Sequence, residues 1–153
     1  MRSSTFIFLI LFLPALFMGC ATTGKAPVFE LHEEIQVPGL DRESVFDLVA
    51  IWMADSYHAQ KTVVESADRK QGRLVASGVA PYSYMGNEQS CRYRMVVETG
   101  DAAVRITYRD LDAFTMQGRT VMTDDVRARV TPNLKRITYS LYRFLATRGA
   151  AMR

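Results

Sequence analysis

The most constraining feature of this sequence is an alternation of apolar and polar residues on either side of Gly100-Asp101. The apolar positions are Cys91, Tyr93, Met95, Val97, Val104, Ile106 and Tyr108. The residues between them are mostly charged, and this period of two predicts a pair of antiparallel strands with one apolar face. Other elements must therefore cover that face, while the opposite face is left in water.

Upstream of this hairpin, the sequence predicts a strand and a helix. Residues 29–37 contain an apolar and polar alternation that indicates an edge strand ended by Pro38-Gly39. Asp41 then stands where a helix N-cap belongs. Apolar residues at helical spacing, Trp52 among them, carry the helix to about Ser56. This helix is the first of two that can cover the sheet.

The segment between that helix and the central hairpin predicts a second hairpin and a loop. Residues 61–66 and 72–79 have the composition of strands, and the polar turn between them ends at Gly72, which tolerates positive φ. Residues 80–89 contain Pro81 and Gly86, which are typical of loops. We therefore expect a short hairpin that is followed by an irregular connection.

The C-terminal part predicts a second helix after an ambiguous segment. Residues 110–125 fit either a loose hairpin or a long loop. Thr131-Pro132 predicts a helix start, because a hydroxyl caps the first turn and proline fits the first helical position. The expected buried face is Leu134, Ile137, Leu141, Phe144 and Leu145. The order of strand, helix, four strands and helix predicts an α+β domain, an antiparallel sheet of about five strands with two helices on one face.

The N-terminus has the parts of a secretory signal. Arg2 is the only charge before an apolar run over residues 5–18, which is short for a bilayer span. Leu16-Phe17-Met18-Gly19-Cys20 then resembles the bacterial lipobox, with Phe17 in place of the usual leucine. The resemblance implies that residues 1–19 are removed and that Cys20 carries diacylglycerol and an N-acyl chain, with no other cofactor expected. An ordinary signal that happens to end before a cysteine is the alternative.

This interpretation divides the chain into three parts. Residues 1–19 form the signal, residues 20–28 a lipidated tether, and residues 29–153 a single domain. Ala21, rather than aspartate, follows the cysteine, and by the same resemblance this favours an outer-membrane lipoprotein that faces the periplasm. Exposure on the cell surface stays open.

Charge and cysteine usage exclude some classes of function. The formal net charge of +3 falls by one when Arg2 leaves with the signal, and this surplus is too small to indicate a nucleic-acid partner. The chain has only two cysteines, Cys20 and Cys91. If Cys20 carries lipid, Cys91 has no partner for an intrachain disulfide.

Several residues resemble a known family. They are Val37-Pro38-Gly39-Leu40, Trp52, Lys61, Val63-Val64-Glu65, Asp68 and Gly72. This pattern is similar to the domain of unknown function 4468 family, bacterial exported proteins whose fold is like that of the TATA-binding protein (TBP). The resemblance covers roughly residues 31–110 and implies a curved antiparallel sheet with two helices on one side. It brings no activity, cofactor or catalytic residue, and the TATA in the name describes shape only.

Arginines gather on the polar face of the central hairpin. They are Arg92, Arg94, Arg105 and Arg109, and Arg73 can join them from the neighbouring strand. Such a face attracts anionic lipid, glycan or an acidic partner. The alternative is an ordinary solvated sheet face that Glu98 and Glu65 neutralise in part.

Catalytic and metal-binding patterns are weak. Cys91 is expected to face the core as an inert thiol, and the only histidines, His32 and His58, have no cysteine or carboxylate at ligand spacing. The sequence therefore predicts a non-catalytic binding or scaffolding module attached to the membrane through its lipid, with an envelope protein as a possible partner. The rival hypotheses are a periplasmic enzyme that uses Cys91 or His58, and a binder of anionic lipid or glycan through the basic sheet face.

Overall fold

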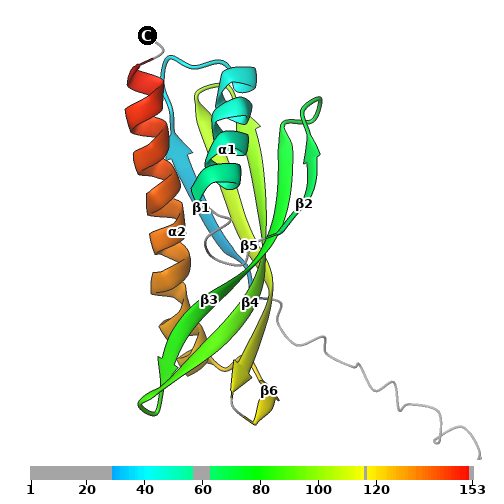
Figure 1. Cartoon of the computed structure of the whole chain (residues 1–153), viewed down its shortest axis with the longest axis vertical. Coiled ribbons are helices and arrows are strands. Elements are labelled where there is room, and N and C mark those ends of the chain that lie inside the picture. Colours follow the sequence, from blue (N-terminus) through cyan, green and yellow to red (C-terminus); the bar gives the residue numbers. More distant parts are fainter. Residues whose placement is uncertain (1–28, 57–62, 116, 152–153) are drawn as a thin grey trace, which may run out of the picture.

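One antiparallel sheet with two helices on one face makes up the fold, as Figure 1 shows for the computed structural model. The structure describes residues 29–56, 63–115 and 117–151, so the predicted signal, Cys20 and His58 lie outside the described residues. The strands are β1 (Leu31–Gln36), β2 (Val63–Asp68), β3 (Arg73–Tyr84), β4 (Asn87–Gly100), β5 (Ala103–Thr115) and β6 (Gly118–Thr120). The helices are α1 (Arg42–Ser56) and α2 (Asp124–Ala150).

The sheet confirms the predicted α+β class. Its strand order is β1-β5-β4-β3-β2, and β6 pairs with the far end of β5. Within the described residues every pairing is antiparallel, and the sheet has six strands rather than about five. The central hairpin has the predicted partners, with Val97 opposite Ile106 and Gly100 opposite Ala103.

Helix α1 begins and ends where the sequence predicts. The Asp41 carboxylate accepts the Ser44 backbone N–H at 2.9 Å and the Ser44 hydroxyl at 3.0 Å, which satisfies a donor of the first turn. These hydrogen bonds hold the pKa of Asp41 below its usual value. The apolar stripe of the helix, which includes Trp52, is buried against the sheet and α2.

The core lies between the sheet and the two helices, and buried polar contacts fix its layers. The Tyr93 and Tyr108 rings meet edge to face, with centroids 5.6 Å apart. The Tyr108 hydroxyl forms a hydrogen bond of 3.0 Å with the Thr138 hydroxyl of α2. Trp52 of α1 donates through its indole N–H to the Ser140 hydroxyl at 3.3 Å. These bonds tie α2 to both the sheet and α1, because a buried aromatic hydroxyl or N–H needs a partner.

The prediction of a loop over residues 80–89 is wrong. Strand β3 continues to Tyr84 and β4 starts at Asn87, so that only Met85 and Gly86 form the turn. The backbone φ angles of these two residues are 49° and 78°, the geometry of a tight hairpin turn. Ala80 and Tyr82 are buried in the core. Their alternation with exposed residues favours a strand more strongly than Pro81 favours a loop.

The predicted start of the last helix is also wrong. Helix α2 begins at Asp124, and the Thr123 hydroxyl caps it by accepting the Val126 N–H at 3.3 Å. Pro132 therefore lies inside the helix, where it is exposed. Val126 and Val130 extend the buried stripe by two turns, and this packing offsets the hydrogen bond that the proline removes. Among the described residues, no helix is long and apolar enough to cross a bilayer.

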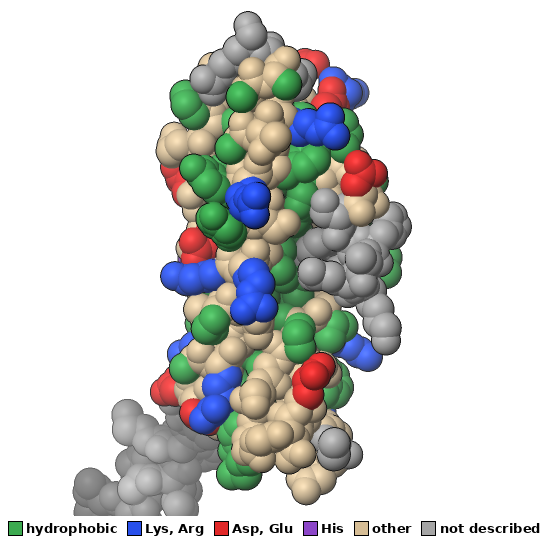
Figure 2. Space-filling view, turned by 60° about the vertical axis from the view of Figure 1, so that its left-hand side comes forward, with side chains coloured by type: hydrophobic (Ala, Val, Ile, Leu, Met, Phe, Trp, Pro, Cys, Tyr) green, Lys and Arg blue, Asp and Glu red, His purple; other side chains and the backbone are tan. Residues whose placement is uncertain are grey.

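The segment over residues 110–125 adopts the hairpin, which was one of its two predicted forms. Strand β5 continues to Thr115, and β6 returns along it with Ala113 opposite Thr120. The segment then leads directly into α2, which runs along the length of the sheet (Figure 1). Figure 2 shows the same molecule with this helix turned toward the viewer.

The Met85 turn offers a test of this hairpin. A methionine with positive φ is strained, whereas asparagine tolerates that conformation and favours this type of turn. We expect Met85→Asn to raise the free energy of unfolding by up to about 1 kcal/mol in urea melts. Met85→Val is the control, because a β-branched residue is disfavoured there and should lower it. A gain with valine would contradict the turn geometry.

Candidate binding site on the open sheet face

The five arginines singled out in the sequence lie on the sheet face that turns away from the helices. Register places Arg94 opposite Arg109, and it places Glu98 between Arg105 and Arg73 on its two neighbouring strands. Arg92 faces Asp112 across the β4–β5 pair. This face is called the open face below.

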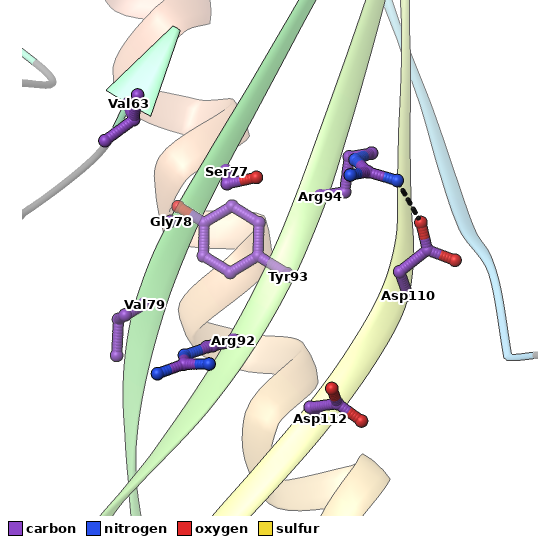
Figure 3. A pocket seen from close by; sticks show the side chains of 9 residues that line it. All are labelled: Val63, Ser77, Gly78, Val79, Arg92, Tyr93, Arg94, Asp110 and Asp112. Carbon is purple, nitrogen blue, oxygen red and sulfur yellow. Dashed lines mark hydrogen bonds and ion pairs between the residues drawn. The ribbon is translucent and has the colours of Figure 1, made fainter. Parts of the chain in front are cut away.

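A β-bulge decides which residues join the arginines. Arg92 is opposite Asp112 and Arg94 is opposite Arg109, so Tyr93 alone faces both Asp110 and Leu111. Asp110 has a φ of 53°, which only a few residue types adopt readily. The extra residue turns Asp110 onto the open face beside Arg94, as Figure 3 shows.

Arg94 is held by two carboxylates. Its Nε lies 3.0 Å from Glu65 Oε2, and its Nη1 lies 2.9 Å from Asp110 Oδ2. Glu65 also accepts the Ser77 hydroxyl, and this hydrogen bond, with the contribution of Arg94, holds the pKa of Glu65 below its usual value. The two carboxylates raise the pKa of Arg94. Arg94 therefore already has two carboxylate partners on the sheet surface.

Two further arginines of the open face have carboxylate partners, and a third is partly enclosed. Arg105 Nη1 is 3.8 Å from Glu98, and Arg109 Nε is 3.9 Å from Asp110. Arg73 Nε is buried and has no hydrogen-bond partner among the described residues. The face is thus a mixed array of charges, and its positive charge is largely compensated.

Arg92 differs from its neighbours. Its guanidinium lies over the Phe114 ring, 4.9 Å from the centroid, and it has no ion pair among the described residues. Asp112, its register partner, instead binds Arg119 of β6. A guanidinium that stacks on an aromatic ring keeps its N–H donors free for a planar anion.

Arg92 lines a hollow of about 400 Å³ on the open face, shown in Figure 3. The residues of the hollow are Val63, Ser77, Gly78, Val79, Arg92, Tyr93, Arg94, Asp110 and Asp112. They come from β2, β3, β4 and β5, and they combine apolar walls with charged groups. Such a combination suits a ligand that has both an apolar part and an anionic group.

Cys91 lies on the other side of the sheet, in the core, as the alternation predicts. Its side chain is fully buried, and burial raises the pKa of its thiol to about 12. The thiol is therefore protonated at neutral pH, which weighs against a role as nucleophile. His32 accepts or donates a hydrogen bond with Thr107 at 3.1 Å, and among the described residues no cluster of three possible metal ligands occurs.

Sequence reasoning missed the acidic partners and the ring that define this site. Asp110, Asp112 and Phe114 all follow the last predicted strand residue, in the segment whose form was ambiguous. A signal was nevertheless present, because the apolar positions change from even numbers at Tyr108 to odd numbers at Leu111. A change of parity within a strand indicates a bulge.

Comparisons with known proteins agree with this fold. A family model described as a domain of unknown function (DUF4468) with TBP-like fold matches residues 32–113. A crystal structure of a TBP-like protein from Parabacteroides distasonis is 9% identical, with a TM-score of 0.66 over 80% of this chain and 95% of that one. A DUF4468 family protein from Bacteroides ovatus is 12% identical, with a TM-score of 0.53 over 80% of each chain. Curated proteins gave no significant match.

The burial of Cys91 leads to a labelling prediction. At pH 8 we expect iodoacetamide to modify this thiol at least about a hundredfold more slowly in the native protein than in urea, because the reactive thiolate is suppressed. The modified peptide identified by mass spectrometry distinguishes Cys91 from Cys20. Rapid labelling of native Cys91 would reopen the thiol-enzyme hypothesis.

Proposed function

Because the chain belongs to the DUF4468 family with TBP-like fold, a family defined by its fold and not by an activity, we propose a function from the chain's own chemistry. The protein is an envelope lipoprotein that is anchored through acylated Cys20. Its domain is a non-catalytic binding module that receives an anionic group of its partner in the hollow of the open face. The observation that carries the proposal is the guanidinium of Arg92, which lines that hollow and has no ion pair among the described residues.

The anchor part of the proposal rests on the N-terminal sequence. A charged start and a short apolar run lead to Leu16-Phe17-Met18-Gly19-Cys20, at the spacing of a lipoprotein signal. Two or more acyl chains on one cysteine hold a protein stably on a membrane, whereas a single chain does not. Ala21 favours the outer membrane and a domain in the periplasm.

The binding part rests on the contrast between Arg92 and Arg94. Arg94 already binds two carboxylates, so a ligand would have to displace them. Arg92 stacks on Phe114 and has no ion pair with any described residue, so its N–H groups can donate to a ligand. A carboxylate or phosphate in the hollow would make two parallel hydrogen bonds with this guanidinium, while Val63 and Val79 contact an adjoining apolar group.

The burial of the Cys91 thiol supports a binding role more than a role as a thiol enzyme. Cys91 is separated from the hollow by the thickness of the sheet, and its pKa is raised well above the range of catalytic cysteines. Two of the four charged groups of the hollow, Arg94 and Asp110, form an ion pair of 2.9 Å. A preorganised pair of this kind suits recognition of a partner.

Intact mass and cell fractionation test the anchor. Protein from its own host should lack Met1 to Gly19, carry acyl mass and sediment with membranes. The Cys20→Ser variant should carry no acyl mass, because it lacks the thiol that receives the lipid. A wild-type protein that is soluble and free of lipid would overturn the anchor.

Ligand preference tests Arg92. The probes are N-acetylphenylalanine and its amide, which share one apolar group and differ by a carboxylate. Equilibrium dialysis of the protein in lipid nanodiscs, with empty nanodiscs as the blank, should show about tenfold preference for the acid, the size expected for a charge-assisted hydrogen bond. Arg92→Gln should remove that preference.

The matched control is Arg105→Gln, which removes an equal charge from the same face. Arg105 lies outside the hollow and pairs with Glu98, so the preference for the acid should persist. Equal losses in the two variants would mean that general charge, rather than the hollow, attracts the probe. Equal binding of acid and amide by the wild type would contradict the proposed site.

A further inference from the structure

Beyond its first two residues, Asp124 and Asp125, helix α2 carries basic and aromatic side chains on its outer side and no acidic ones. Residues 126–153 contain seven Lys and Arg residues and no Asp or Glu. Beyond Pro132, the exposed large side chains of the helix are Lys135, Arg136, Tyr139, Tyr142, Arg143 and Arg148, and the first five, which share one side of the helix, are called the α2 outer face below. Figure 2 shows basic side chains spaced along this side of the molecule with hydrophobic ones beside them.

Helical spacing gathers these residues on one surface. Arg136, Tyr139 and Arg143 are three and four residues apart, so they lie in a line along the helix. Tyr139 and Tyr142 are 59% and 48% exposed, and their ring centroids are 6.1 Å apart. Exposed tyrosines suit a membrane interface, where the ring contacts apolar matter and the hydroxyl contacts water.

The charge of α2 changes along its length. In the first turns, Arg127 pairs with Asp124 at 3.0 Å and Arg129 pairs with Asp125 at 3.0 Å. Beyond Pro132, Lys135 pairs with Glu33 at 3.5 Å. Arg136 and Arg143 have no ion pair among the described residues. The positive charge that remains uncompensated therefore lies beside the two exposed tyrosines.

The chain enters the domain next to this helix. The Phe29 ring lies 4.5 Å from the Arg127 guanidinium carbon, and Glu33 of β1 reaches Lys135. The nine residues from Cys20 to Val28 span at most about 30 Å when fully extended. A lipid on Cys20 would thus keep α2 within reach of the bilayer surface.

We propose that the α2 outer face lies on an anionic phospholipid surface. Tyr139 and Tyr142 reach the headgroup level, and Arg136 and Arg143 contact lipid phosphates. This inference rests on the proposed acyl anchor, which makes contact with the surface intramolecular and so compensates for the small number of charges. In this orientation the open face and its hollow turn toward the aqueous compartment, because the helices cover the opposite side of the sheet.

A fluorophore on the helix tests the contact. The acylated protein is reconstituted into vesicles of phosphatidylcholine alone, or with about 30% phosphatidylglycerol, which is the anionic share that gives a strong surface potential. The probe NBD is attached to Ala146→Cys on the exposed side of α2, or to Ser66→Cys on strand β2 as the matched position. On anionic vesicles the emission of the Ala146 probe should shift to the blue, and salt should reverse the shift. The Ser66 probe should report water throughout.

Charge variants identify the residues that make the contact. Arg136→Gln with Arg143→Gln should reduce the membrane-bound population of the Ala146 probe about 25-fold, at about fivefold for each basic residue. The control, Arg105→Gln with Arg119→Gln, removes the same charge from strands of the sheet. It should reduce the membrane-bound population of the Ala146 probe less than about twofold. Equal reductions would overturn the assignment to α2.

Each remaining outcome has one meaning. An acylated protein whose Ala146 probe reports water on both vesicles would overturn this inference and leave the anchor intact. A protein without acyl mass would overturn the anchor. Mixing that protein with the same vesicles would still show whether α2 binds the anionic surface. A blue shift on neutral vesicles, or one that grows with protein concentration without vesicles, would contradict the anionic surface and indicate apolar insertion or a second copy.

Discussion

The rest of the structure depends on the β-bulge at Asp110. Before it, Ile106 and Tyr108 face the core, and after it, Ala113 does so. If the alternation had continued without the extra residue, Asp110 and Asp112 would have entered the core in its place, because a slip of one residue exchanges the two faces of a strand. An unpaired buried carboxylate costs far more than the local strain of one residue with positive φ. The bulge therefore preserves the core and delivers two acids to the open face.

Sequence reasoning predicted the parts of the fold that depend on periodicity and capping. The alternation around Gly100-Asp101 predicted the central hairpin, and Asp41 predicted the start of α1. The predictions were wrong where they depended on a single residue type and not on the apolar pattern around it. Thr131-Pro132 alone predicts a helix start, although Val126 and Val130 continue the same buried stripe upstream. The site was predicted only in part, because alternation placed Arg92 on a face and gave no account of the acids that the bulge brings there.

The two surfaces of the domain differ in how their charges are compensated. On the open face, arginines and acids alternate across strands, and Arg92 remains as the exception above Phe114. On α2, no basic residue beyond Lys135 has an ion pair with a described residue, and the exposed tyrosines lie in this part of the helix. The open face, with paired charges around a hollow, suits binding of a specific partner. The α2 outer face, with exposed tyrosines and basic residues, suits contact with an anionic membrane surface. With the proposed anchor, the α2 outer face would point toward the bilayer and the open face would point away from it.

Photo-cross-linking in the native host tests most directly whether the open face binds a partner and α2 contacts the membrane. The photoreactive residue p-benzoylphenylalanine is placed at Val79, which lines the hollow, or at Ala146 on α2. The account predicts a discrete adduct at Val79 that Arg92→Gln abolishes, and phospholipid adducts at Ala146 that this substitution leaves unchanged. Phospholipid adducts at Val79, or a discrete protein adduct at Ala146, would contradict the assignment of the partner to the open face and of the membrane to α2.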